Sequence, residues 1–450
     1  MGAKLVPVFL TITLFFLPVV NGEGAGVRDV LRADLAYVTG IVESDGSVSA
    51  SFDPVRSLRS HALVGSMAAL LHLGLGDIES LQLLNRVAAQ VNGRVEGEDG
   101  VDLGFDVSSS SYAENLITHL TVANFLSLHY GLTKDLRSKA NMLKLVQSLE
   151  RRLGWAPPTS KAAFLTLSSR ISFMTGGQPL TPDVSEALRE YTQHMDDIIN
   201  YSAGGYIGLT SSLSQLSQLL GAAHEAGLEP PVELVALWAV HIEYVVNASL
   251  SLPKNSDSYQ DLLRSLASLV DAAENIHLKQ SRYAGEQAIS LAKSIAAMWR
   301  AGDRILLLPV DAFDVYPLDP LIPGEEIAAV AGRRIMIADL RFPTLLLKLE
   351  QVVGKIQELH DVVSLAMSKV SVRGEYFPLV ERGVLPSDEF VNRWWRASLL
   401  STYLALQRAP SIQQRSQTIQ FFLNSHPTFM GILSILLALA LMYRVGLLRW

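Results

Sequence analysis

The side chains of this sequence that could do chemistry are carboxylates and histidines. Asp196 and Asp197 stand about one helical turn before Asn200. Carboxylates at that spacing can hold a magnesium ion against a diphosphate. The third acid of such a cluster is replaced here by Asn200, and no second cluster follows. We therefore interpret the two aspartates as a solvated helix end rather than a metal site.

A second group of acids lies in a glycine-rich stretch. The carboxylates between residues 96 and 106 are Glu96, Glu98, Asp99, Asp102 and Asp106. Calcium takes several oxygen ligands from a loop bent at glycine, so the composition suits that ion. The spacing of the acids matches no standard calcium loop. We interpret the stretch as an exposed acidic connection, with a calcium site as the alternative.

The histidines lack a convergent partner in the sequence pattern. His119 follows Glu114 by five residues, and His224 and His241 each stand near a glutamate. A general acid–base pair must converge, and a five-residue offset puts the two groups on different helix faces. We expect these histidines at helix ends or on the surface. The sequence thus predicts no catalytic residue, no cofactor-binding residue and no metal ligand, and it favours a non-catalytic role over an enzymatic one.

Composition narrows the partners. The 450 residues carry 37 basic and 44 acidic side chains, a formal net charge of −7, without any basic run. A nucleic-acid-binding protein needs a cationic footprint, so no nucleic acid is expected. The absence of cysteine excludes disulfides, thiolate nucleophiles and cysteine-ligated metals. The expected partners are a membrane and other membrane-protein subunits, and no small-molecule substrate or cofactor is indicated.

Two apolar ends indicate the compartment. A lysine, an apolar run and a small residue before Glu23 predict a secretory signal peptide over 1–22. The apolar segment after Pro427 predicts a transmembrane helix over 426–445, followed by a short cytosolic tail over 446–450. A removed lipid-anchor signal and a buried helix are the alternatives for this segment. The expected location is the endoplasmic reticulum membrane, with the N-terminal domain in the lumen.

Two short motifs fit that location. Asn200-Tyr-Ser202 and Asn247-Ala-Ser249 match the acceptor pattern for N-linked glycosylation. The sequence therefore predicts glycosylation at Asn200 and Asn247.

Between the ends, apolar residues recur at helical spacing and are interrupted by glycine and proline. Five helical hairpins are expected: 58–71 with 78–91, 112–130 with 134–153, 161–174 with 181–200, 211–226 with 232–246, and 257–276 with 285–300. A helix pair repeating every 40–50 residues or so must stack on its neighbours to bury its apolar face. The predicted fold class is all-α, with stacked hairpins over 23–300 forming an α/α toroid or a solenoid.

A mixed, mostly helical membrane-proximal region is expected over 301–425. Helices are predicted over 345–370 and 388–407, and 327–340 is interpreted as either strands or a helix. Trp394, Trp395 and Arg396 form the densest aromatic spot, which suits packing, a partner surface or a membrane interface.

Three segments carry a resemblance to a known family. Asp196–Leu219, Phe164–Leu188 and Leu291–Val310 are similar in order and punctuation to the N-terminal helical region of the ribophorin II family, accessory subunits of oligosaccharyltransferase. The resemblance covers about residues 50–310. It implies a lumenal ring of helical hairpins and a scaffold role without catalytic residues. After this region, the family continues with β-sandwich material and several membrane spans. In this sequence about 110 mostly helical residues follow instead, before one predicted span.

These features lead to one expected function and two rivals. The expected function is a non-catalytic, membrane-anchored lumenal scaffold subunit of an N-glycosylation complex. The first rival is an α/α-toroid enzyme acting on a glycan or prenyl substrate. The second is a single-span receptor at the cell surface or in an organelle.

Overall fold

The computed structural model of the chain describes residues 23–53, 57–97, 112–153, 181–255, 258–275, 278–301, 304–305, 308–311, 334–337, 340–371 and 388–408. The predicted signal peptide, transmembrane helix and tail lie outside these residues. So do residues 98–106 of the acidic stretch and the helix expected over 161–174.

Helices make up most of the described chain, which confirms the prediction of an all-α fold class. The helices are α2 (Glu23–Ile41), α3 (Leu58–Leu75), α4 (Ile78–Glu96), α5 (Tyr112–Thr133), α6 (Leu136–Leu153), α8 (Thr181–Gln193), α9 (Met195–Ala203), α10 (Tyr206–Glu225), α11 (Val232–Ser251), α12 (Tyr259–Ala273), α13 (Lys279–Trp299), α16 (Arg341–Val353), α17 (Gln357–Ser371) and α18 (Asp388–Arg408). The strands are short: β1 (Arg300–Ala301), β2 (Arg304–Ile305), β3 (Leu308–Asp311) and β4 (Arg334–Ile337).

The chain divides into two compact units, and each draws on segments far apart in the sequence. The first unit contains α2 to α5, the start of α6 and most of α18. The second contains the rest of α6, α8 to α13 and α16.

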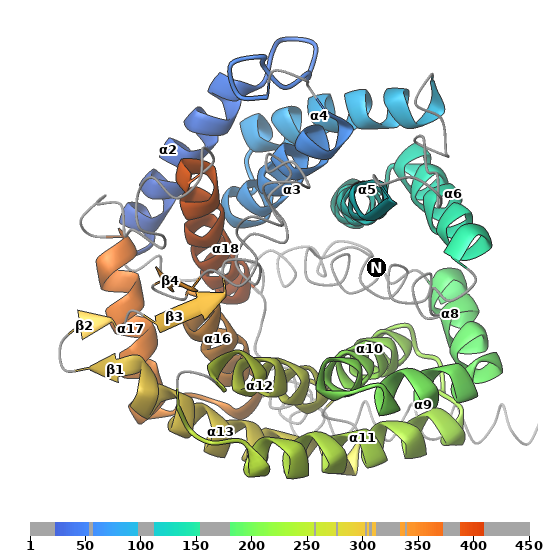
Figure 1. Cartoon of the computed structure of the whole chain (residues 1–450). Coiled ribbons are helices and arrows are strands. Elements are labelled where there is room, and N and C mark those ends of the chain that lie inside the picture. The colour runs from blue at the N-terminus through green and yellow to red at the C-terminus, as the bar shows by residue number, and fades with distance from the viewer. Residues whose placement is uncertain are drawn as a thin grey trace, which may run out of the picture. The chain divides into compact units, whose positions relative to one another are not determined.

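Helix α3 forms the centre of the first unit, where α2, α4 and α5 pack against it (Figure 1). Almost all of its residues are buried, as expected for a helix that is apolar on every side. Ser57 begins the helix by accepting a hydrogen bond from the Ser60 backbone N–H. Gly76 ends it with a φ of 67°, a left-handed conformation that glycine adopts without a steric cost.

The second unit is built around α10 and α12, which pack against each other, with α11 against α10 and α13 against α12. Tyr259, Leu262, Leu266 and Leu269 of α12 recur at helical spacing and are all buried. Trp238 of α11 is fully buried, and its indole N–H donates a hydrogen bond of 2.8 Å to Ser217 Oγ in α10.

Two of the predicted helices are each divided in the structure. The single helix expected over 345–370 is wrong, because α16 ends before Gly354, whose φ of 86° breaks the helical path, and α17 begins at Gln357. The helix expected over 181–200 is likewise two helices, α8 and α9, joined at His194.

The strands form two small two-stranded sheets. In the antiparallel pair, Arg300 faces Ile305 and Ala301 faces Arg304. The other sheet pairs β3 with β4. The stretch 327–340, interpreted as strands or a helix, therefore contains a strand at residues 334–337.

Among the described residues, one helix is long and apolar enough to cross a membrane by length and composition alone. This helix is α11, with 39% of its most apolar window buried inside the structure. A core helix satisfies the same test, and α11 packs against α10 and α12.

Replacing Gly65 by alanine is expected to destabilise the first unit. A β-carbon at residue 65 would lie 2.5 Å from the Phe125 ring, so the ring or a helix would have to move. Overpacking of this kind costs about 1–3 kcal/mol, more than the helix propensity that alanine adds.

Gly93 of α4 provides the matched control, because a β-carbon there would have nothing within 4 Å. Gly93→Ala should raise the free energy of unfolding by up to about 1 kcal/mol. Denaturant unfolding of both full-length variants measures the difference, and equal effects from the two substitutions would contradict this packing.

Candidate functional site

The aspartates singled out in the sequence lie at the start of a short helix. Asp196 and Asp197 are exposed in the first turn of α9, where Asp197 Oδ2 lies 3.3 Å from His194 Nδ1. In the part of the chain that the structure describes, no group of three or more histidines and acids could hold a metal ion. Asp102 and Asp106 lie outside that part.

The expectation of helix ends or surface positions is wrong for His119 and His241, which are buried in the middle of α5 and α11, whereas His129, also buried, lies near the end of α5. His119, His129 and His241 are buried, with exposed fractions of 0, 4 and 3%. Helical spacing places each of them on the face that packs against neighbouring helices. His224 is exposed, as expected.

His129 belongs to a polar latch that connects the two helices of a hairpin. Asp135 caps α6: its Oδ2 accepts hydrogen bonds from the Ser138 N–H at 3.0 Å and the Ser138 Oγ–H at 2.8 Å. His129, near the end of α5, places Nδ1 2.8 Å from the same Ser138 Oγ. One serine hydroxyl thus joins the end of one helix to the cap of the next.

The same latch occurs one hairpin earlier. Asp77 Oδ1 accepts from the Ser80 N–H at 3.0 Å and from Ser80 Oγ at 2.6 Å, and His72 Nδ1 lies 3.0 Å from Ser80 Oγ. In both hairpins the aspartate follows a residue with positive φ, namely Gly76 and Lys134.

Sequence reasoning missed this repeat, although a signal for it exists. Leu-His-Leu-Gly-Leu at 71–75 corresponds to Leu-His-Tyr-Gly-Leu at 128–132, and each is followed by Asp-x-x-Ser. Both motifs serve one local structure, a helix end followed by a capped helix start. The turns of the two hairpins therefore share one local structure.

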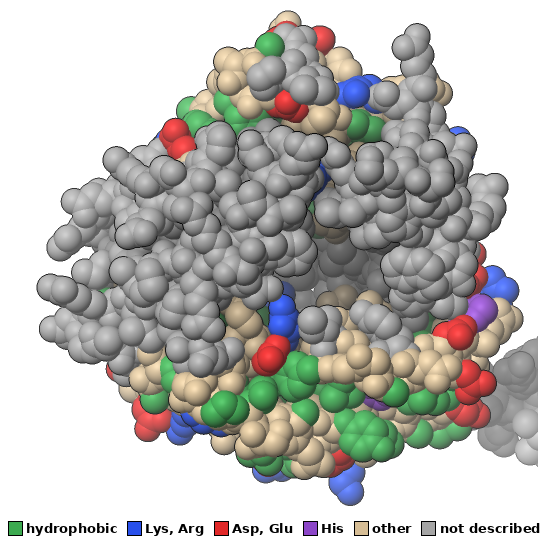
Figure 2. Space-filling view, viewed as in Figure 1, with side chains coloured by type: hydrophobic (Ala, Val, Ile, Leu, Met, Phe, Trp, Pro, Cys, Tyr) green, Lys and Arg blue, Asp and Glu red, His purple; other side chains and the backbone are tan. Residues whose placement is uncertain are grey.

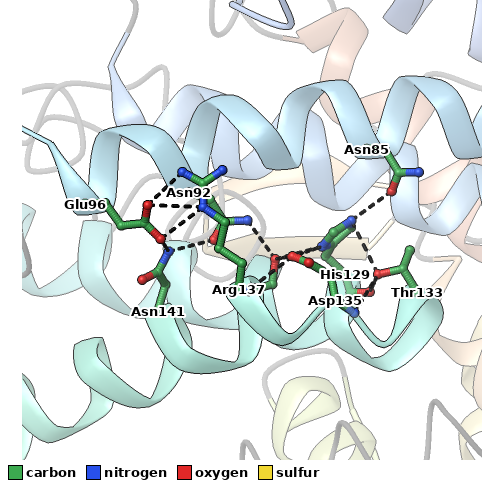
Figure 3. A network of polar contacts seen from close by, with 9 residues as sticks. Asn85, Asn92, Glu96, His129, Thr133, Asp135, Arg137 and Asn141 are labelled. Carbon is green, nitrogen blue, oxygen red and sulfur yellow. Dashed lines mark hydrogen bonds and ion pairs between the residues drawn. The ribbon is translucent and has the colours of Figure 1, made fainter.

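The second latch is also bonded to the first hairpin, as Figure 3 shows. Asn85 of α4 lies with its Oδ1 3.0 Å from His129 Nε2. Asn92, also of α4, donates to Ser138 Oγ at 2.8 Å and accepts from Asn141 of α6 at 2.9 Å. Buried polar groups must be hydrogen-bonded to offset their lost hydration, and here the partners come from the neighbouring hairpin. The network therefore fixes the register between the two hairpins.

Glu96 adds an ion pair with Arg137 to the same network. Its carboxylate accepts bonds of 2.7–3.1 Å from the Arg137 guanidinium and one of 2.8 Å from Asn141. Hydrogen bonds from Arg137 and Asn141 hold the pKa of Glu96 at about 2. Both side chains of the ion pair are more than one third exposed, so it contributes less than about 1 kcal/mol. Glu96 is thus the anionic partner of Arg137 in this structure.

Burial controls the charge of His129. Loss of hydration lowers its pKa to about 4, against a smaller opposing effect of Asp135. The ring is therefore neutral at physiological pH. Its two ring nitrogens lie beside Ser138 of α6 and Asn85 of α4, so the ring links α5 to both helices.

The second unit contains a serine and a histidine with the spacing of a nucleophile and a base. Ser202 Oγ lies 2.7 Å from His241 Nε2, and His241 Nδ1 donates to the Leu237 carbonyl at 2.8 Å. Burial lowers the pKa of His241, which keeps Nε2 free to accept a proton. The serine hydroxyl also lies 2.7 Å from the Ile198 carbonyl and 2.9 Å from Ser212 Oγ. With these neighbours it joins α9, α10 and α11.

The two predicted glycosylation sites lie on helices rather than in loops. Asn200 is exposed in α9 and Asn247 is exposed in α11. Their acceptor-motif serines face inward: Ser202 is half-buried, and Ser249 is 5% exposed and donates from Oγ to the Val246 carbonyl.

A buried ion cluster joins the first and last helices of the first unit. Asp34 of α2 is 0% exposed and accepts hydrogen bonds from Arg393 and Arg396 of α18. Arg393 also pairs with Glu389 and lies 4.4 Å above the centre of the Tyr37 ring. Arg396, which belongs to the tryptophan–arginine spot noted in the sequence, therefore forms an internal ion pair between α18 and α2.

The two latches, the Ser202–His241 pair and the Asp34 ion cluster all link neighbouring helices. Each is held by partners on the adjacent helix or hairpin, and this arrangement stabilises and orients the hairpins.

Acidification is expected to destabilise the protein through His129. The folded-state pKa lies below the unfolded value near 6.5, so the unfolded chain takes up the proton first. The contribution is complete above pH 6.5 and is lost as the pH falls toward about 4, by up to about 3 kcal/mol.

His129→Gln should flatten this pH dependence of unfolding between pH 7 and 4.5, at the cost of some stability at neutral pH. The same substitution at exposed His224 is the control and should keep the wild-type dependence. Parallel pH profiles for His129→Gln and wild type would refute the assignment.

Arg396→Met is expected to cost about 3 kcal/mol, because it removes one partner of a buried carboxylate. Arg282→Met breaks an exposed pair with Glu286 and should cost less than about 0.5 kcal/mol. Thermal unfolding of the two variants measures this contrast, and a loss for Arg396→Met no larger than for Arg282→Met would show that the cluster does not hold α2 to α18.

The chain was compared with protein families, curated proteins and solved structures. The chain matches no protein-family model, no curated protein and no solved structure.

Proposed function

We propose that this chain is a non-catalytic scaffold subunit on the lumenal side of the endoplasmic reticulum membrane. In this proposal a signal peptide directs its entry, a C-terminal helix over 426–445 anchors it, and the hairpins stack as a solenoid or a closed ring. Its partners are the membrane and the other subunits of an oligosaccharyltransferase-like complex.

The observation that carries the proposal is the repeated latch and its bonds to the neighbouring hairpin. Ser138 serves its own hairpin and, through Asn92, the preceding one. A stack joined by buried hydrogen bonds holds its outer surfaces in fixed positions, because few alternative registers satisfy the same groups. A scaffold needs such rigidity to hold its partners in place.

The compartment rests on the sequence of the two ends and on the exposed asparagines of both acceptor motifs. The low charged fraction of 18% and the absence of cysteine are compatible with a protein stabilised by its core and by membrane attachment.

Affinity capture of the tagged full-length chain in mild detergent tests the proposal. We expect membrane subunits of a glycan-transferring complex to be recovered with it. A chain beginning at Glu23, which cannot enter the secretory pathway by the predicted signal, is the matched control and should recover none. Recovery of the full-length chain alone would contradict the scaffold role.

One observation favours the alternative hypothesis of an enzyme: the pair formed by Ser202 and His241. A serine-reactive fluorophosphonate that labels the wild type but not Ser202→Ala would favour an enzyme. The receptor reading predicts the protein at the cell surface, whereas the scaffold proposal predicts reticular membranes, so imaging separates the two.

A further inference from the structure

The outer face of α11 carries large apolar side chains in contact with solvent. Val240, Tyr244 and Leu250 are 45, 58 and 68% exposed, although the opposite face of the helix, with Trp238 and Val245, is buried. At about 100° per residue, the three exposed side chains span an arc of about 120° around the helix, opposite the buried face. We call this surface the α11 stripe, and Figure 2 shows hydrophobic side chains gathered over α11.

Asn247 lies within the α11 stripe. It stands three residues after Tyr244 and three before Leu250, so about 4.5 Å of helix axis separates it from each. Its side chain is exposed, and it is the acceptor residue of the motif ending at Ser249. A group attached to Asn247 would begin in the middle of the stripe.

We propose that an N-linked glycan on Asn247 covers the α11 stripe. The inference rests on the proposed function, since it requires the chain to enter the lumen. Sugar rings present C–H faces that pack on aromatic and aliphatic side chains such as Tyr244 and Leu250, while their hydroxyls face water. The attached glycan thus replaces an exposed apolar surface by a hydrated one.

The transfer requires a lipid-linked oligosaccharide diphosphate as donor. The amide nitrogen of Asn247 forms a bond to the anomeric carbon, and the bond from that carbon to the diphosphate oxygen breaks. The diphosphate leaves with the electron pair, and the amide loses one proton.

The burial of Ser249 bears on when this transfer takes place. The hydroxyl of Ser249, the third residue of the motif, is buried and bonded to the Val246 carbonyl inside α11. A transferase that recognises this hydroxyl reaches it before α11 folds. Asn247 is therefore modified on the nascent chain.

The test uses the full-length chain made in cultured animal cells. Enzymatic release of N-glycans in ¹⁸O water converts each glycosylated asparagine to a labelled aspartate, which mass spectrometry locates. Wild type and Ser249→Thr, which keeps the motif, should carry the label at residue 247. Asn247→Gln should lose it, and Asn200→Gln should leave it unchanged.

Hydroxyl-radical footprinting then reports coverage of the stripe. Removal of the glycan, or Asn247→Gln, should raise oxidation of Tyr244 and Leu250 by about twofold or more. Val232 is 74% exposed at the other end of α11, about 18 Å along the axis from Tyr244, and serves as the internal control with unchanged oxidation.

Protection from added protease in sealed microsomes separates the two ideas. A protected chain with no label at Asn247, or with the same Tyr244 oxidation in wild type and Asn247→Gln, would overturn the glycan inference alone. A chain digested outside the microsomes would overturn the proposed function as well.

Discussion

The buried carboxylate of Asp34 illustrates the constraint on which this structure depends: a polar group removed from water must find a partner on another helix. An unpaired charge in the core would cost several kcal/mol, and the two guanidinium groups from α18 offset that cost. Asp34 and Arg396 are 362 residues apart in the sequence. The first unit therefore holds together segments from the two ends of the described chain, and the same requirement acts in each hairpin latch.

The latches hold the turns of two hairpins through side-chain hydrogen bonds. An aspartate caps the second helix, a serine shares its hydroxyl, and a histidine from the first helix comes within hydrogen-bond distance. His129 remains neutral because burial lowers its pKa, so it can satisfy polar groups without placing a charge in the core. In both latches the histidine connects the end of one helix to the start of the next. Such links between helices would suit the proposed scaffold role, because a scaffold must keep its surfaces in place.

The exposed face of α11 is apolar, in contrast to the buried polar links described above. The α11 stripe and the acceptor motif at Asn247 occupy one surface, so the helix that packs Trp238 into the core also exposes Tyr244 to solvent. A covalent glycan and a packed hairpin are complementary solutions to the same problem, the removal of apolar surface from water.

The sequence by itself determined the helical class, because apolar residues at three- and four-residue spacing can form a buried face only in a helix. It also located most helices, including α18, and the exposed acceptor asparagines. It missed the breaks at His194 and Gly354, since a local turn competes with a continuing apolar pattern. Only the tertiary structure decided the burial of His129 and the pairing of Asp34 with Arg396, because these depend on which distant helices meet. Hydrophobic spacing acts along the chain, whereas the partner of a buried charge is chosen in space.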